Sequence, residues 1–277
     1  MEKSIKKFVE DIISKKELQN LDLQLVKEVL EKFFNKNKEL NNSLEIKKFN
    51  NRSKEYKIVL KEIRKQLREI YGVFIEKNYS KRFELLKTLK KHDKKQTIID
   101  ILSLHKSTKE RLPYYKEVYK KIFQITKKQK TIFDIGCGLN PISYFFLGYK
   151  PKYIASDISK KDLEFIKGFF KKINTNSKTI KIDLINEQEK LKKIKADICF
   201  LFKLLDSLET RKKHISKILI ENIKCKWLVV SFSKTSLGGC KKIDKNKRNW
   251  LFNFIKKKGY FHKEFETPNE LFIVIKK

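Results

Sequence analysis

The segment 131–141, TIFDIGCGLNP, has the residue types of a site that binds a nucleoside. Apolar residues run into an acidic one, and Gly136, Cys137 and Gly138 follow directly. Glycine allows the unusual dihedral angles of a tight turn and leaves the backbone bare where a ligand approaches. The pattern therefore predicts a β-strand that ends in a glycine turn and continues into a helix opened by Pro141.

A carboxylate follows this turn at a spacing that suits a ribose. The hydrophobic run 153–156 ends at Asp157, nineteen residues after Gly138. In a nucleotide-binding βαβ unit, an acidic residue about 20 positions after the turn accepts hydrogen bonds from ribose hydroxyls. A dinucleotide-binding turn would carry a third glycine where this chain has Pro141. The turn thus favours a nucleoside ligand other than a dinucleotide.

Alternating strands and helices must position these residues. From residue 131 onward, β-rich runs alternate with helical patterns, and Thr267-Pro-Asn269 leaves no room for a helix before the last strand. Such βα units closed by a hairpin predict an α/β fold, the seven-stranded sheet of class I Rossmann-like S-adenosylmethionine methyltransferases. The expected strands are 131–133, 153–156, 179–182, 197–200, 227–231, 260–265 and 270–275. The expected helices are 141–147, 160–173, 209–223 and 246–258.

The net charge of +34 indicates a polyanionic partner. Lysine and arginine number 67 against 33 acidic residues, and such a field concentrates polyanions near the surface. Residues 1–50 carry 11 basic and 9 acidic side chains, whereas residues 51–123 carry 21 and 9. Nucleic acid is the first candidate partner. The alternative is a chain rich in solvated lysine or adapted to high internal salt.

The part of the chain before the sheet has a helical pattern. Apolar residues recur at helical spacing in the stretches 25–34, 59–74 and 83–89, and Gly72 is the only glycine before residue 123. Because the basic excess begins in this region, we expect a helical N-terminal domain, residues 1–123, that binds RNA or the ribosome. A methyltransferase domain is expected over residues 124–277.

Several classes of protein are disfavoured by composition. The sequence has no run of about 18 apolar residues, so no membrane partner is expected, and its N-terminus lacks the apolar core of a signal peptide. The four cysteines have no paired spacing for zinc. We therefore predict a cytoplasmic protein with reduced cysteines and no metal site.

Four motifs extend well beyond the glycine turn. They are LHKSTKER at 104–111, FDIGCGLNP at 133–141, FLFKLL at 200–205 and VVSFSKTSLG at 229–238, with NEL at 269–271 as a further match. In these motifs the chain resembles the aminoglycoside-resistance 16S ribosomal RNA guanine-N7 methyltransferases, the FmrO family. The motif at 104–111 is the most specific, because generic methyltransferases lack it. The resemblance covers most of the chain.

The resemblance implies S-adenosylmethionine as the cofactor and Arg111 as the contact to its carboxylate. A planar, permanently charged guanidinium suits a carboxylate better than lysine does. The alternative is a surface ion pair of Arg111 with Glu110 or Glu117. The cofactor-binding residues implied by position are Arg111, Gly136, Cys137, Gly138, Asp157, Ile158, Asp183 and Leu184.

Two further implied roles have equally plain alternatives. Asp183 would accept a hydrogen bond from the adenine amino group, or it is an ordinary loop aspartate. Lys203 would be the catalytic residue, at the edge where the target base arrives, or it is one more solvated lysine.

Missing motifs are consistent with N7 chemistry. Methylation of an exocyclic amine usually needs an Asn/Asp-Pro-Pro-Tyr/Phe loop after the fourth strand, where this chain reads KLLDS at 203–207. Methylation of a pyrimidine carbon needs a nucleophilic cysteine, commonly in a Pro-Cys context that is lacking here. Guanine N7 already carries an exposed lone pair, so its methylation needs placement and no general base.

Two basic segments are candidates for contact with RNA. Lys241 and Lys242 precede Trp250, on which an extruded guanine could stack, although a tryptophan on a C-terminal helix is more often core packing. Lys90 and Lys91 lie in a lysine-rich turn that could face phosphates. The expected partner is the small ribosomal subunit with its 16S-type rRNA, bound by a monomer.

The target is less constrained than the chemistry. The leading expectation is guanine N7 at the decoding site of the assembled small subunit. Another rRNA or tRNA position, a small-molecule substrate and a non-catalytic RNA-binding relative remain as alternatives, and aminoglycoside resistance is a possible consequence.

Overall fold

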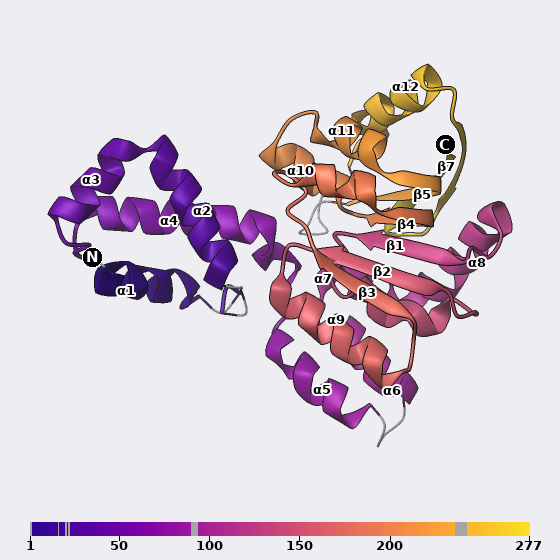
Figure 1. Cartoon of the computed structure of the whole chain (residues 1–277), viewed down its shortest axis with the longest axis horizontal. Helices are drawn as coiled ribbons and strands as arrows, with labels where there is room; N and C mark the ends of the chain where they lie inside the picture. Colours follow the sequence, from indigo (N-terminus) through magenta and orange to yellow (C-terminus); the bar gives the residue numbers. More distant parts are fainter. Residues whose placement is uncertain (1, 16, 20, 22, 90–93, 236–242) are drawn as a thin grey trace. The chain divides into compact units, whose positions relative to one another are not determined.

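The computed structural model describes residues 2–15, 17–19, 21, 23–89, 94–235 and 243–277 (Figure 1). The chain divides into two compact units, Met1–Ser80 and Lys81–Lys277. The expected division at residue 123 therefore falls inside the second unit. The change from helical to strand periodicity in the sequence marks where the strands begin. A compact unit, by contrast, begins at the first residues that pack against its core, and in this chain these residues precede the first strand.

The first unit is helical. Its helices are α1 (Glu2–Ile13), α2 (Leu23–Lys36), α3 (Lys38–Ile46) and α4 (Lys54–Ile70), followed by a short 3-10 turn, Gly72–Phe74. Helix α4 begins at Ser53, whose hydroxyl accepts the Tyr56 backbone N–H at 3.2 Å and so caps the helix. One face of α4 is buried, with Tyr56, Val59, Ile63 and Leu67 at its centre. The helical pattern predicted for this region is confirmed.

Among the described residues of the second unit, four α-helices precede the sheet. They are α5 (Arg82–Thr88), α6 (Lys94–Leu102), α7 (Lys106–Arg111) and α8 (Tyr115–Thr126). Buried Arg82 on α5 forms an ion pair with buried Asp162 at 3.0 Å, and the ring of Tyr119 on α8 stacks on Phe200 of the sheet. These contacts explain why α5 to α8 belong to the same unit as the sheet.

The sheet has seven strands in the order β3-β2-β1-β4-β5-β7-β6; β7 runs antiparallel to both β5 and β6, and the other neighbouring strands pair in parallel. This arrangement confirms the fold predicted from the sequence. The strands are β1 (Thr131–Ile135), β2 (Lys152–Asp157), β3 (Ser177–Lys181), β4 (Lys195–Phe202), β5 (Lys224–Ser233), β6 (Phe261–Glu266) and β7 (Glu270–Lys276).

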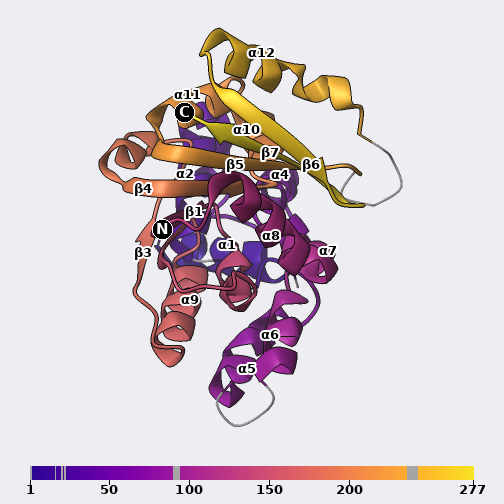
Figure 2. The ribbon, with the colours of Figure 1, turned by 90° about the vertical axis from the view of Figure 1, so that its right-hand side faces the viewer.

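Helices cover both faces of the sheet (Figures 1 and 2). On one face an aliphatic core joins the strands to α10 (Leu205–Arg211), α11 (Ile215–Asn222) and α12 (Asn249–Lys257). The other face is largely aromatic and packs against α8, α9 (Lys160–Lys172) and the 3-10 helix η4 (Asn140–Phe146). Because both faces are covered, the carboxyl edge of the strands is where a ligand can reach the sheet.

Two predicted helices differ in detail from the observed ones. The segment 141–147 forms the 3-10 helix η4. The single helix expected over 209–223 is two helices, broken at His214, which adopts a left-handed conformation (φ 65°). The Glu209 carboxylate accepts the backbone N–H groups of His214 and Ser216, both at 2.8 Å, and thereby starts α11.

The described part of the chain contains no helix that is both long and apolar enough to span a bilayer.

Candidate active site

The residues predicted for the site meet at the carboxyl edge of the sheet. The ends of β1, β2 and β4 contribute the glycine turn, Asp157 and Lys203. Strand β7 runs antiparallel, so its first residue, Glu270, pairs with Ser233 at the end of β5 and reaches the same edge. Helix α7 supplies Arg111 from before the sheet.

The glycine turn has the unusual dihedral angles that its sequence predicts. Gly136 and Gly138 have φ values of 62° and 49°. A Cβ atom on Gly136 would lie 2.6 Å from Leu204 Cδ1, and one on Gly138 would lie 3.0 Å from His105 Nε2. Between them the Cys137 side chain is buried, and its backbone N–H donates to Ser156 O at 2.9 Å. The turn is therefore a bare backbone surface, bordered by Leu204 and His105.

Asp157 is held directly against this turn. Its Oδ2 accepts the Gly138 N–H at 2.9 Å, and its Oδ1 accepts the Ser159 N–H at 3.0 Å. Burial, with the nearby charge of Asp162, raises the pKa of Asp157 to about 6, although these backbone N–H groups oppose the shift. The next residue, Ile158, is half-buried.

Asp183 and Leu184 follow β3 at the same edge. Asp183 Oδ1 accepts the Ile185 N–H at 3.0 Å, and the Asn186 side-chain amide donates to its Oδ2. The carboxylate thus closes the turn after β3. The Leu184 side chain is buried in the aliphatic core.

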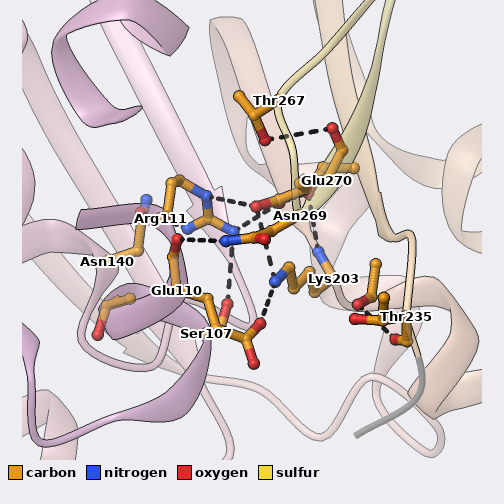
Figure 3. A network of polar contacts seen from close by, with 12 residues as sticks. Ser107, Glu110, Arg111, Asn140, Lys203, Thr235, Thr267, Asn269 and Glu270 are labelled. Carbon is orange, nitrogen blue, oxygen red and sulfur yellow. Dashed lines mark hydrogen bonds and ion pairs between the residues drawn. The ribbon is translucent and has the colours of Figure 1, made fainter. Parts of the chain in front are cut away.

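Arg111 is buried and forms a two-bond ion pair with Glu270 (Figure 3). Its Nε donates to Glu270 Oε2 at 3.0 Å and its Nη2 to Glu270 Oε1 at 2.7 Å. The remaining donors reach Asn140 Oδ1 at 3.1 Å, Ser107 Oγ at 3.4 Å and Tyr115 OH at 3.5 Å. The partner of Arg111 is therefore neither of the two glutamates weighed from the sequence.

The surroundings keep this guanidinium charged. Burial alone would lower the pKa of Arg111, but the charge and hydrogen bonds of Glu270, together with Tyr115 and Tyr119, raise that pKa above its ordinary value. The guanidinium carbon also lies 4.6 Å from the centre of the Phe202 ring, on β4, in a cation–π contact. Arg111 and Glu270 are a fixed, neutral pair at the centre of the site.

Lys203 is also held in place. Its backbone is left-handed (φ 53°), and its N–H donates to Ser231 O at 3.1 Å and Ser231 Oγ at 3.0 Å. Its Nζ lies 2.5 Å from Glu110 Oε2 and 3.8 Å from Glu270 Oε2, and its side chain is 8% exposed. Lys203 is therefore not one of the many solvated lysines of this chain.

A buried polar chain extends from Arg111 to the start of the glycine motif. Asn140 accepts from Arg111 and from the Tyr115 hydroxyl, and its amide donates to Asp134 Oδ2 at 2.8 Å. The Tyr153 hydroxyl donates to the same oxygen at 2.7 Å. Burial raises the pKa of Asp134 to about 7, although both hydrogen bonds oppose the shift.

His105 lies near Gly138, Arg111 and Lys203 as a neutral ring. Burial, with the charges of Arg111 and Lys203, lowers the pKa of His105 to about 3. The described residues contain no cluster of three or more His, Cys, Asp or Glu side chains that could hold a metal ion.

None of the residues predicted to bind RNA belongs to this network as far as the described residues show. Lys90, Lys91, Lys241 and Lys242 lie outside the described residues. Trp250 is on α12, half-buried and packed against the aliphatic core. Its role as a stacking platform stays a prediction.

Sequence reasoning assigned no site role to several residues of the network, among them Glu110, His105, Asn140 and Glu270. Glu110 and His105 stand in the motif at 104–111, and Asn140 stands in the glycine motif, so motif membership was a usable signal. Glu270 belongs to the NEL segment. Its pairing with Arg111, 159 residues earlier, has no signal in linear spacing.

Comparison with known proteins identifies the relatives of this chain. A 16S rRNA (guanine(1405)-N(7))-methyltransferase of Micromonospora echinospora is 28% identical over 228 residues, which cover 79% of this chain and 82% of that protein. A protein of the same name from Proteus mirabilis is 30% identical over 200 residues, which cover 65% and 69%.

Solved structures agree in fold. The 16S rRNA methyltransferase RmtF, in complex with S-adenosyl-L-homocysteine, matches with a TM-score of 0.75 at 23% identity and covers 100% of this chain and 99% of its own. The 16S rRNA methylase ArmA matches with a TM-score of 0.56 at 26% identity and covers 70% and 97%.

A family model decides the assignment. The model described as ribosomal RNA methyltransferase (FmrO) matches residues 46–275, which include all four motifs and every residue of the network. The resemblance inferred from those motifs is thereby confirmed, and the chain belongs to the FmrO family of ribosomal RNA methyltransferases.

Proposed function

We propose that this protein is an S-adenosylmethionine-dependent methyltransferase that modifies N7 of a guanine in small-subunit rRNA. The observation that carries the proposal is the family match together with relatives that are named for this reaction. The structure supports the proposal with a glycine turn held by Asp157 and an ordered lysine, both at the carboxyl edge of the sheet.

The residues of the turn fit the nucleoside and methionine parts of such a cofactor. No side chain stands on Gly136 or Gly138, so a ligand can lie against the backbone. Asp157 is already fixed at the tip of β2, and its carboxylate can accept from two ribose hydroxyls. Ile158, Asp183 and Leu184 would border the adenine. When bound, S-adenosylmethionine supplies an electrophilic methyl group on a sulfonium.

Arg111 can still serve the cofactor carboxylate. Its short bonds go to Glu270, whereas its contacts to Ser107 and Tyr115 are long, at 3.4 and 3.5 Å. A carboxylate that replaced these two hydroxyls would gain charge-assisted hydrogen bonds while the ion pair with Glu270 stayed intact.

The site suits a reaction that needs no general base. Guanine N7 presents its lone pair without deprotonation, so the protein has to align the base with the methyl group and exclude water. The product purine carries a positive charge. Glu110 and Glu270 balance Lys203 and Arg111, so this charge would form in surroundings that are not positive overall.

The proposed substrate is the assembled small subunit, modified by a monomer in the cytoplasm, where ribosomes work. The proposed target is the decoding-site guanine, since the relatives are named for guanine 1405. Methylation there would be expected to confer aminoglycoside resistance.

A transfer assay tests the proposal. Labelled S-adenosylmethionine is supplied with small subunits, naked small-subunit rRNA and bulk tRNA in parallel, and borohydride–aniline cleavage locates N7-methylguanosine. The expected result is label in intact subunits with one cleavage at the decoding site. Label in tRNA or at another rRNA guanine would reassign the target. Cofactor binding without label in any RNA would contradict the proposal.

A further inference from the structure

Lys203 is held by one dominant partner. The Glu270 carboxylate already accepts two bonds from Arg111 and the Ser231 hydroxyl, and it lies 3.8 Å from Lys203 Nζ. Glu110 lies at 2.5 Å and makes no other ion pair among the described residues. Glu110 is therefore the group that fixes the Lys203 ammonium.

Both partners are anchored through their backbones. Lys203 adopts a left-handed conformation that is unfavourable for an L-residue, and two hydrogen bonds to Ser231 hold it there. The Glu110 carbonyl accepts from Asn269 Nδ2 at 3.1 Å. Strain of this kind at a ligand edge is typical of a functional constraint. The Glu110 side chain is 34% exposed, so its role is not that of a core residue.

The pair borders the place where a ligand would lie. Leu204, the residue after Lys203, would contact a Cβ on Gly136 at 2.6 Å. Strands β1 and β4 are neighbours, but the chain continues from β1 to β2 on one side and from β4 to β5 on the other. Open α/β sheets bind ligands at this kind of switch in strand order. An ammonium there has donors beyond the one that Glu110 uses, because Lys carries three.

The chemistry of guanine suits a fixed ammonium. Its Hoogsteen edge presents N7 and O6 side by side, both acceptors, whereas adenine presents an amino donor in place of O6. A donor to O6 would align N7 and would reject adenine. In methyl transfer the N7 lone pair forms the new N–C bond while the S–C bond of the sulfonium methyl group breaks and leaves its electron pair on sulfur as a neutral thioether. The purine becomes cationic, so the donor needs a counter-charge.

We propose that Glu110 is a positioning residue that holds the Lys203 ammonium as the hydrogen-bond donor to O6 of the target guanine. The pair thereby selects guanine over adenine, and Glu110 neutralises the charge that would otherwise oppose the cationic product. This inference rests on the proposed function and names the contact by which that site recognises its base.

A double-mutant cycle tests the link between the two residues. Single-turnover methylation of small subunits is measured for Lys203→Met, Glu110→Gln and the double variant, with cofactor binding and thermal melting as checks on folding. Losing a charged hydrogen bond predicts a rate about 10- to 100-fold lower for Lys203→Met and about 10-fold lower for Glu110→Gln. The double variant should be no slower than Lys203→Met. Multiplicative losses would overturn the inference.

A matched control separates position from charge. Glu117→Gln removes the same charge from α8, where Glu117 is exposed and pairs with Lys121 at 2.6 Å. It should leave the rate unchanged. A rate loss equal to that of Glu110→Gln would assign the effect to net charge and overturn the positioning role.

A change in the base tests the O6 contact. Subunits reconstituted from ligated rRNA carry guanine, inosine or 2-aminopurine at the target position; inosine keeps O6 and 2-aminopurine lacks it. Wild type should methylate guanine and inosine alike and 2-aminopurine about 10-fold or more slowly. Lys203→Met and Glu110→Gln should lose most of that discrimination. Full discrimination by Lys203→Met would overturn the inference, whereas no methylation of guanine by wild type would overturn the proposed function itself.

Discussion

At the scale of single residues, the site depends on charges that are buried in pairs. Arg111 and Glu270 are each about 1% exposed, and every donor of the guanidinium has an acceptor. A buried pair of this kind contributes little net stability, but removing one partner leaves the other charge without compensation. Variants of Arg111 therefore report on folding as well as on its proposed contact with the cofactor.

Arg111→Ala is expected to destabilise the protein by about 3–5 kcal/mol and to abolish cofactor binding. Urea denaturation measures the first effect and calorimetric titration the second. The double variant Arg111→Met/Glu270→Gln should recover much of the stability, since no charge is left alone, yet still fail to bind. As a control, Arg68→Ala breaks a partly exposed pair with Glu17 and should cost about 0–1 kcal/mol. Equal losses in the two single variants would contradict the buried-pair account.

Cofactor binding should depend on the ionisation of Asp157. The pKa of Asp157 is raised to about 6, so its carboxylate is charged above that pH and protonated below it. The ionised form accepts from ribose hydroxyls more strongly, and we expect the affinity for S-adenosylhomocysteine to fall as the pH drops from 7 to 5. Asp157→Asn should bind weakly, with a flat profile over that range. A wild-type profile equally flat would remove Asp157 from the ribose contact.

At the scale of elements, the glycine turn and the β4 end form one surface. Leu204 packs where a side chain on Gly136 would stand, so the turn after β1 and the start of α10 are fitted to each other. The backbone of the turn therefore has two constraints, a positive φ and a close neighbour.

Gly136→Ala and Gly148→Ala separate these two constraints. Both glycines have positive φ values, 62° and 74°, but a Cβ on Gly148 would meet nothing within 4 Å. Gly148→Ala should therefore cost only about 1 kcal/mol, the backbone cost of the conformation. Gly136→Ala should cost about 1–3 kcal/mol more and should weaken cofactor binding. Similar stability and binding in the two variants would refute the fit between Gly136 and Leu204.

At the scale of the whole molecule, the positive charge is uneven. Residues 1–80 carry 19 basic and 13 acidic side chains, whereas residues 81–277 carry 48 and 20. Most of the field that attracts a polyanion therefore arises from the unit that contains the sheet. Its effect on RNA binding should fall steeply as salt rises.

Phosphate contacts by Lys241 and Lys242 predict a specific change in salt dependence. Replacing both with alanine should reduce the slope of log affinity for small-subunit rRNA against log salt by about 2. Lys190→Ala/Lys192→Ala is the matched control, because each of these exposed lysines already pairs with a glutamate three residues away. A filter-binding series from low to high salt measures both slopes, and equal slopes would remove Lys241 and Lys242 from the phosphate contact.

Features set by neighbouring residues could be predicted from the sequence. The strands, the glycine turn and the placement of Asp157 at the end of β2 all follow from local alternation, glycine dihedrals and spacing. The break of the predicted helix 209–223 could not be predicted in this way, because no glycine or proline marks it in the sequence. It depends on the Glu209 side chain, which accepts backbone N–H groups at the start of the next helix.

The sequence by itself determined the class of the protein, because its motifs and alternating pattern are local and specific to one family and one sheet. Only the tertiary structure decided which charged residues of the site pair with each other. Arg111 and Glu270 meet because antiparallel β7 inserts beside β5 and carries its first residue to the carboxyl edge of the parallel strands. Lys203 acquires Glu110 as its partner because α7 packs across that edge. Such pairings depend on long-range packing, which spacing along the chain does not encode.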